Sequence, residues 1–316
     1  MKRILTPLAA AASALALAFA PAAQAGSGDA PAPAPSPEAP APTPETAPPQ
    51  ARPALWKVAD EDTTIWLFGT VHALPEGIDW YHGPVARALG ESEMLVTEIE
   101  MTAETAASMK ALVTRIGTLP EGQSLRAMLN AEQRTVYEDA LARLGLPAAA
   151  FDPYEPWYAA MMLGMLPLLK EGYSPAAGVE TVLQQARGEE MPRGALETLE
   201  EQLAIFDSLP MEAQVRLLIE TAEGVDDIKA MLDLMVAEWA EGDAAELARL
   251  INESMSDPVL AERLLYRRNA NWARWIDERL DRPGTVFLAV GAGHLAGTQS
   301  VQDKLAELGI ATARVQ

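Results

Sequence analysis

Two of the three histidines in this 316-residue chain follow the same local pattern at widely separated positions. An apolar run over residues 64–68 leads into a Gly-x-x-His motif that ends at His72. A second run over residues 286–290 leads into another Gly-x-x-His motif, ending at His294. In α/β folds, chemistry gathers just beyond the carboxyl ends of the strands. We therefore predict that His72 and His294 meet over one site, where imidazole nitrogens could bind a metal ion.

Three further polar residues fall at positions that the sequence pattern predicts to be buried. Glu98 lies near the end of an apolar strand over residues 94–100, where a carboxylate needs a cation, a metal or a hydrogen-bond donor. Arg268 and Asn269 share the apolar stripe of a helix predicted over residues 258–280. Buried polar groups must find partners. Arg268 could hold a site carboxylate or bind a substrate, and a purely structural ion pair is the alternative.

Other residues near these candidates have simpler interpretations. His82 lies in a polar and aromatic loop that no apolar strand precedes, so we expect it to have no role in the site. Arg267 points away from the apolar stripe of its predicted helix and is expected to face solvent. The chain has no cysteine. A metal site would therefore have to use nitrogen and oxygen ligands.

The elements that position these residues form a mixed pattern of strands and helices. Strand patterns cover residues 56–58, 63–68, 94–100, 285–290 and 312–315. Between residues 102 and 280, apolar side chains recur every three to four positions, which predicts a large helical insertion. A helix over about residues 298–308 would join the last two strands. We predict an α/β (α+β) fold whose central mixed sheet is built from the N- and C-terminal segments.

The N-terminal part of the chain reads as targeting sequence and tether. Residues 1–25 resemble a cleavable secretory signal, and residues 26–53 are a Pro/Ala-rich segment expected to stay disordered. This leaves a single domain over residues 54–316 in a periplasmic or secreted protein, without integral membrane contact after cleavage. The apolar run 161–169 is too short to span a membrane and predicts a core helix broken at Pro167.

The charge balance limits the partners. The formal net charge is −21 at pH 7. A chain this acidic repels nucleic acid and anionic membrane surfaces, so neither is an expected partner. A peptide or protein substrate remains compatible with this charge.

Taken together, the motifs resemble the TraB/GumN family, whose animal relatives are the Tiki proteins. The similarity extends in order over essentially the whole predicted domain. Its matching segments are residues 56–58, 65–72, 96–99, 178–180, 196–203, 268–272 and 290–295. One departure is visible at Gly178-Val179-Glu180, where the family pattern has Gly-x-Asp.

The resemblance implies a metal-dependent, peptidase-like domain with His72, His294 and Glu98 as site residues. It adds Glu180 as a further candidate metal ligand and Glu197 as a candidate catalytic carboxylate. We predict an exported metal-dependent hydrolase, and a peptidase is the favoured class. It would use a divalent ion such as Mn, Co, Zn or Fe. Glu98 would be a third ligand or the general base.

In this prediction, Arg268 assisted by Asn269 would stabilise the charge that develops on the substrate. The helical insertion would supply the substrate groove. The alternative is a non-catalytic periplasmic protein that binds haem, a metal ion or peptides. In that case the polar residues would bind the ligand or stabilise the fold.

Overall fold

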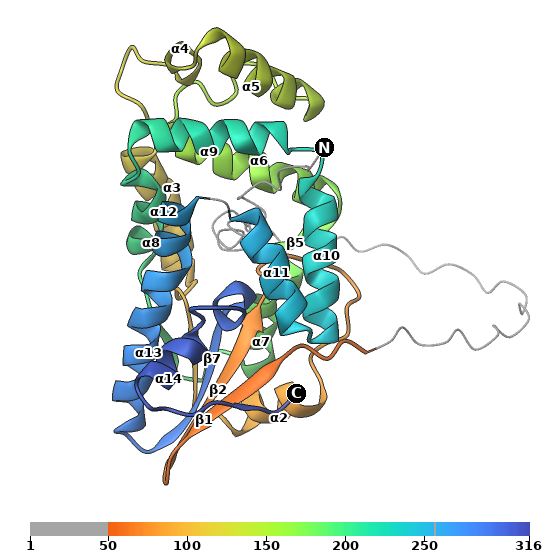
Figure 1. Ribbon diagram of the computed structural model, residues 1–316, viewed down its shortest axis with the longest axis vertical. Helices are drawn as coiled ribbons and strands as arrows, with labels where there is room; N and C mark the ends of the chain where they lie inside the picture. Colours follow the sequence, from red (N-terminus) through yellow and green to blue (C-terminus); the bar gives the residue numbers. More distant parts are fainter. Residues whose placement is uncertain (1–49, 256) are drawn as a thin grey trace, which may run out of the picture.

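The computed structural model describes residues 50–255 and 257–316, and its centre is a mixed sheet of six strands (Figure 1). The strand order is β6 (Arg193–Ala195), β4 (Met94–Thr97), β7 (Gly284–Gly291), β2 (Thr63–Thr70), β1 (Leu55–Ala59) and β8 (Ala313–Arg314). The first four strands in this order run parallel, and β1 and β8 add antiparallel pairs at one edge. The predicted mixed sheet is confirmed, with one addition: its edge strand β6 comes from within the segment 102–280 that the sequence pattern predicts to be helical.

The helical insertion follows β4 and occupies most of the chain up to β7. Its helices and short helical turns are α3 (Ala103–Ile116), α4 (Leu125–Met128), α5 (Ala131–Arg143), α6 (Pro156–Lys170), η2 (Pro175–Ala177), α7 (Val179–Arg187), α8 (Leu199–Asp207), α9 (Met211–Glu223), α10 (Ile228–Glu241), α11 (Ala244–Ser254), α12 (Pro258–Ala261), η3 (Glu262–Tyr266) and α13 (Arg267–Leu280). Figure 1 shows α4, α5, α6 and α9 stacked at the end of the molecule opposite the β1–β2 hairpin. Within the described residues, no helix is long and apolar enough to cross a membrane.

Helices cover both faces of the sheet. On one face, α13 and α14 (Val301–Glu307) contribute Trp272, Ile276 and Leu305 to a core with the buried strand residues. On the other face, α2 (Gly83–Glu91) packs with Phe68 and Phe287, and this core continues into the helical insertion. A short pair of strands, β3 (Leu74–Pro75) and β5 (Tyr173–Ser174), joins the loop after β2 to the end of α6. The site residues at the strand ends are therefore held from both sides.

Three local expectations need correction. Helix α6 continues through Pro167, because its many buried side chains pack against α9 and outweigh the lost hydrogen bond. Strand β4 ends at Thr97, whose hydroxyl donates to the Ile99 carbonyl and turns the chain, so Glu98 lies just beyond the strand. The helix predicted over residues 258–280 contains the π-helical turn η3, which ends immediately before α13. The predicted signal, residues 1–25, and the tether up to residue 49 lie outside the described residues.

A buried tyrosine in α5 gives a test of the packing above the sheet. Tyr137 has no exposed surface, and its hydroxyl has no hydrogen-bond partner among the described residues. Burial, with a contribution from Asp152, raises the pKa of Tyr137 well above its usual value. A folded-state pKa above the unfolded value contributes stability below about pH 10 that is lost as the pH rises toward the folded value.

We expect Tyr137→Phe to flatten the loss of stability at alkaline pH. Between about pH 9 and about pH 11, the variant should lose about 1 kcal/mol less unfolding free energy than the natural protein. At neutral pH it should be equally stable or slightly more so, since it removes an unsatisfied buried hydroxyl. Urea titrations at both pH values measure this difference. Equal losses in both proteins would show that Tyr137 ionises in the folded state as readily as in the unfolded chain.

Candidate active site

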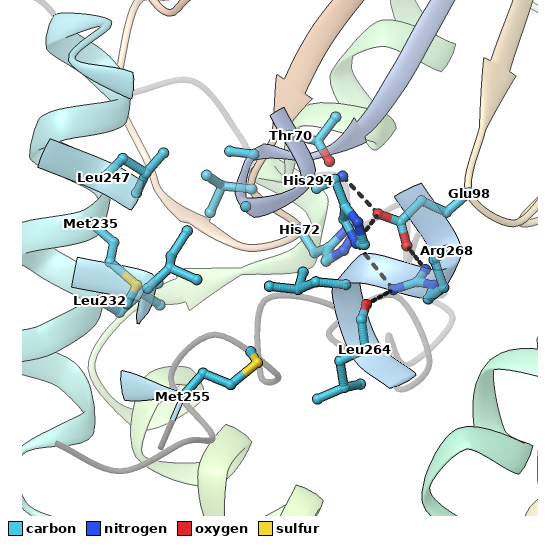
Figure 2. Close-up of a pocket in the computed structure, with 16 residues that line it drawn as sticks. Thr70, His72, Glu98, Leu232, Met235, Leu247, Met255, Leu264, Arg268 and His294 are labelled. Atoms are coloured by element: carbon cyan, nitrogen blue, oxygen red, sulfur yellow. Dashed lines mark hydrogen bonds and ion pairs between the residues drawn. The ribbon is translucent and has the colours of Figure 1, made fainter. Parts of the chain in front are cut away.

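Each of the four parallel strands delivers one polar residue to the same edge of the sheet. Glu197, Glu98, His294 and His72 follow the carboxyl ends of β6, β4, β7 and β2, which are neighbours in that order. The backbone N–H of Glu197 donates to the carbonyl of Glu98 at 2.8 Å, so the two chain segments stay paired beyond their strands. The sequence prediction that the histidines meet at one sheet edge fits this arrangement. Figure 2 shows His72, His294, Glu98 and Arg268 converging there.

Arg268, near the start of α13, is the centre of a buried ion network. Its Nη2 donates to Glu98 Oε2 at 2.6 Å and to Glu197 Oε2 at 2.9 Å, and its Nε donates to Glu197 Oε1 at 2.9 Å. Its Nη1 donates to the Leu264 carbonyl at 2.9 Å, within the π-helical turn. All three guanidinium nitrogens therefore have acceptors. In the described arrangement Arg268 holds site carboxylates, which is one of the roles that the sequence left open.

Glu98 is buried but ionised. Its Oε1 accepts the backbone N–H of Gly291 at 2.7 Å, and its Oε2 accepts from Arg268 and from Gln202 Nε2. Burial opposes ionisation, but Arg268, the two histidines and the Gly291 hydrogen bond together outweigh it and hold the pKa of Glu98 well below its usual range. A carboxylate with so low a pKa is a poor proton acceptor near neutral pH. Its charge and its position suit it better to binding a cation.

The ring of His294 is fixed in one tautomer by its neighbour Asn269. The Asn269 Nδ2 donates to the backbone carbonyl of Gln299 at 2.7 Å, which leaves Asn269 Oδ1 as the acceptor for His294 Nδ1 at 2.6 Å. His294 Nδ1 therefore carries the proton and Nε2 carries a lone pair. Burial and then Arg268 lower the pKa of His294 to about 3, so the ring is neutral near pH 7. Its Nε2 accepts a hydrogen bond from Arg268 Nη1 at 3.1 Å and lies 3.7 Å from Glu98 Oε1.

His72 has a carboxylate on the corresponding side of its ring. Its Nδ1 lies 2.5 Å from Glu180 Oε1, and both side chains are buried. Burial lowers the pKa of His72, but the charge and close contact of Glu180 together with the charge of Glu98 outweigh it, so the net shift is upward. Neither ring nitrogen of His72 has a hydrogen-bond partner with good geometry among the described residues, although both are buried, so the contact with Glu180 is a close ionic approach. Both histidines thus have Nδ1 close to an oxygen, and His294 has its Nε2 near Glu98.

Glycines allow the motif segments to approach this closely. A Cβ at Gly178 would lie 2.0 Å from the carbonyl oxygen of His72, and the N–H of Val179 donates to the Val71 carbonyl at 3.0 Å. The first turn of α7 therefore presses against the backbone of the His72 loop and carries Glu180 to the ring. At Gly69 a Cβ would come within 3.0 Å of Ala292, in the turn η4 (Ala292–Leu295) that carries His294.

Comparison with known proteins shows which family has this arrangement of motifs. The sequence pattern of the TraB/PrgY/gumN family matches residues 54–314, which covers the whole sheet and the helical insertion. The chain belongs to this family. The resemblance predicted from the spaced motifs is therefore confirmed.

A more distant relative links the TraB/PrgY/gumN domain to a known activity. The chain is 25% identical over 304 residues to the metalloprotease TIKI1 of Danio rerio, which aligns 79% of this chain with 60% of that protein. The chain thus spans about 60% of the length of this curated relative. No solved structure matches the chain. Similarity to a metalloprotease points toward a hydrolase, and the finer assignment needs the geometry of the site.

The donor atoms of this TraB/PrgY/gumN site fit a divalent ion in their chemistry. Imidazole nitrogens and a carboxylate are suitable ligands, and metal-binding histidines characteristically hold their second nitrogen on a carboxylate or carbonyl. His294 does so through Asn269, and His72 Nδ1 lies 2.5 Å from Glu180 Oε1. Ligand atoms about 2.0–2.2 Å from an ion can span the 3.7 Å between His294 Nε2 and Glu98 Oε1. However, no three acidic or histidine side chains in the described ranges gather as one ligand group. The predicted set with Glu180 is not assembled, because Glu180 stands behind His72.

Two members of the site were missed by sequence reasoning. Gln202 Nε2 donates to Glu98 Oε2 at 2.9 Å and to Glu197 Oε2 at 3.1 Å, and Trp272 Nε1 donates to Glu197 Oε1 at 3.1 Å. The burial of Gln202 could have been predicted from the sequence, because this residue falls on the apolar stripe that Leu199, Leu203 and Phe206 form on α8. Trp272 has no such signal, since a tryptophan on an apolar stripe is ordinary core. As expected, Arg267 is exposed.

The polar cluster forms one side of a cavity of about 50 Å³. The opposite side is an apolar wall from the helical insertion, made by Leu232, Met235, Leu247, Ile251, Met255 and Leu264. Figure 2 shows the labelled members of this wall facing the two histidines. The expectation that the insertion supplies a substrate groove is consistent with this position.

Proposed function

We propose that this protein is an exported, metal-dependent hydrolase that cleaves peptide bonds in peptide or protein substrates. The observation that carries the proposal is the matched presentation of the two histidines. His294 Nδ1 is held by Asn269 Oδ1, His72 Nδ1 lies 2.5 Å from Glu180 Oε1, and both rings line the cavity together with Glu98. This arrangement is the usual outer support of a metal-binding imidazole. The distant similarity to a metalloprotease supports the same activity.

The roles of the residues follow from their contacts. His72, His294 and Glu98 would have to move closer together to hold the ion, because they do not gather as one ligand group in the described residues. Glu180 and Asn269 would orient the rings. Arg268 holds Glu98 in place and keeps it ionised, together with Gln202. Glu197 in turn holds Arg268 with both carboxylate oxygens. When bound, a divalent ion supplies Lewis-acid polarisation of the scissile carbonyl and a water of lowered pKa.

The remaining steps belong to the protein. The helical insertion covers the reacting groups and excludes bulk water, which strengthens every charge interaction in the cavity. The positive charge of Arg268 beside His294 lowers the free energy of negative charge that develops on the substrate. Export through the N-terminal signal remains part of the proposal and would place this chemistry in the periplasm or outside the cell.

A haem-binding function is the less favoured reading. A pocket for a cofactor or drug-sized ligand typically measures about 300–1,000 Å³. The cavity that both histidines line has a volume of about 50 Å³. A porphyrin could reach these histidines only after large rearrangement of the apolar wall.

Hydrolysis of a diverse peptide library by the purified domain tests the proposal. We expect cleavage that depends on added Mn, Co, Zn or Fe, and a loss of about 100-fold or more in kcat/KM for Glu98→Gln and for His294→Ala. His82→Ala is the matched control, because the third histidine caps α2 outside the cavity. It should retain activity. Cleavage that survives both site substitutions would place the chemistry elsewhere.

A further inference from the structure

The cavity beside the histidines has a polar side and an apolar side, and the two sides place different demands on a substrate. His72, His294 and Glu98 line the polar side, where the reacting bond must lie under the proposed function. The apolar wall faces them across the cavity (Figure 2). A group attached directly to the reacting bond must therefore point at the apolar wall.

The wall is built from three separate parts of the helical insertion. Leu232 and Met235 come from α10, Leu247 and Ile251 from α11, and Leu264 from the π-helical turn. All five are buried. The turn of His294 packs directly on this wall, because a Cβ at Gly293 would lie 3.1 Å from Ile251 Cδ1. The wall and the reacting residues are therefore held at a fixed separation.

Among the described residues, the cavity offers no free partner to a charged side chain. The charged groups other than histidine that line it in this part of the chain are Glu98 and Arg268, and these are paired with each other at 2.6 Å. A lysine or aspartate side chain placed here would lose its hydration without gaining a counter-charge. The lining therefore selects against charge and favours apolar groups.

The size of the cavity restricts the apolar group as well. An apolar cavity of about 150 Å³ is known to hold one benzene molecule. The cavity here measures about 50 Å³. A methyl or isopropyl group fits in such a space, whereas a phenyl ring does not.

We propose that this cavity is the subsite for the residue beside the scissile bond, and that it selects small apolar side chains such as Ala and Val. This inference rests on the proposed function, since it assumes that the reacting bond lies at the histidines. Leu232, Met235, Leu247 and Ile251 are then specificity-determining residues. Their lengths set the upper limit on substrate size.

A series of peptides that differ only beside the scissile bond measures this selectivity. Peptides with Ala or Val should have kcat/KM values at least about 10-fold above those with Phe, Asp or Lys. In Met235→Ala, the ratio of kcat/KM for the Phe peptide to kcat/KM for the Ala peptide should rise by about 10-fold or more, because the shorter side chain enlarges the cavity. Ile251→Val is a milder truncation that should shift the ratio in the same direction. Equal rates for all peptides would overturn the inference.

The matched control is Leu234→Ala. Leu234 neighbours Met235 on α10 but is 53% exposed and does not line the cavity. It is not part of the binding or catalytic residues, and its replacement should leave the Phe to Ala ratio unchanged. A ratio that rises equally in Leu234→Ala and Met235→Ala would show that general loosening of α10, and not the wall, sets the preference.

A binding measurement separates this inference from the proposed function. Carbon-13 methyl labels on methionine report on Met235 and Met255, with Met235→Leu and Met255→Leu identifying their resonances. N-acetyl-alaninamide should shift both resonances, and N-acetyl-lysinamide should not. If the alanine compound shifts the methionine resonances but no peptide is hydrolysed, the result would support the subsite and contradict the proposed hydrolase activity. Turnover without shifts or size preference would contradict the subsite alone.

Discussion

Replacement of Arg268 by methionine should abolish hydrolysis and destabilise the fold more than any other single change in the site. The substitution removes the cation that pairs with Glu98 and Glu197 and leaves both carboxylates short of a partner. Removing one member of a buried ion pair typically costs about 3–5 kcal/mol. Loss of the same charge beside His294 should lower kcat/KM by about 100-fold or more. Urea unfolding and peptide hydrolysis measure the two effects.

The neighbouring arginine provides the matched control. Arg267 is exposed, and within residues 50–255 and 257–316 no ion pair or hydrogen bond is recorded for its side chain. Arg267→Met should therefore change the unfolding free energy by less than about 0.5 kcal/mol. A second variant separates charge from packing. Arg268→Met combined with Glu98→Gln should be more stable than Arg268→Met alone, since one stranded charge is removed. Equal stability of Arg268→Met and Arg267→Met would contradict the network.

Gly178→Ala should have the second largest effect, although the change adds a single methyl group. The new Cβ would lie 2.0 Å from the His72 carbonyl oxygen and 2.7 Å from its carbonyl carbon. Both are backbone atoms and cannot rotate away, so α7 or the His72 loop must shift. We expect a loss of about 3 kcal/mol in unfolding free energy. The shift also separates Glu180 from the His72 ring, which should lower kcat/KM by about 10-fold or more.

Gly90→Ala is the control for a glycine without a close neighbour. Gly90 lies inside α2, and no atom stands within 4 Å of its added Cβ. Alanine should stabilise this helix by about 0.5 kcal/mol. If Gly178→Ala were tolerated as well as Gly90→Ala, the close contact of α7 with the His72 loop would not be a constraint on the site.

The sequence predicted those site residues whose positions follow from the local pattern of apolar and polar residues. His72 and His294 follow apolar strands, and Glu98 follows another, so the parallel sheet rule brings them to one edge. Arg268 and Asn269 interrupt an apolar helical stripe, and both are buried as predicted. These features depend only on residues within a few positions of each other, which is why they can be read before the fold is known.

The parts that the sequence did not predict depend on contacts between distant segments. Gln202 reaches Glu98 across 104 positions in sequence, and only the docking of α8 on the sheet brings them together. The role of Glu180 behind His72 requires the close approach at Gly178, which no local pattern reveals. The π-helical turn before Arg268 is similarly hidden, because one extra residue per turn barely disturbs the apolar periodicity.

The stoichiometry of bound metal tests the central claim most directly. The protein should be purified without chelators or a nickel column, loaded in turn with Mn, Co, Zn and Fe, and analysed by inductively coupled plasma mass spectrometry. We predict about one tightly bound ion per chain in the natural protein, loss of that ion in His72→Ala and in His294→Ala, and retention in His82→Ala. Absence of metal from the natural protein after every loading, or retention of metal in both site variants, would contradict the account.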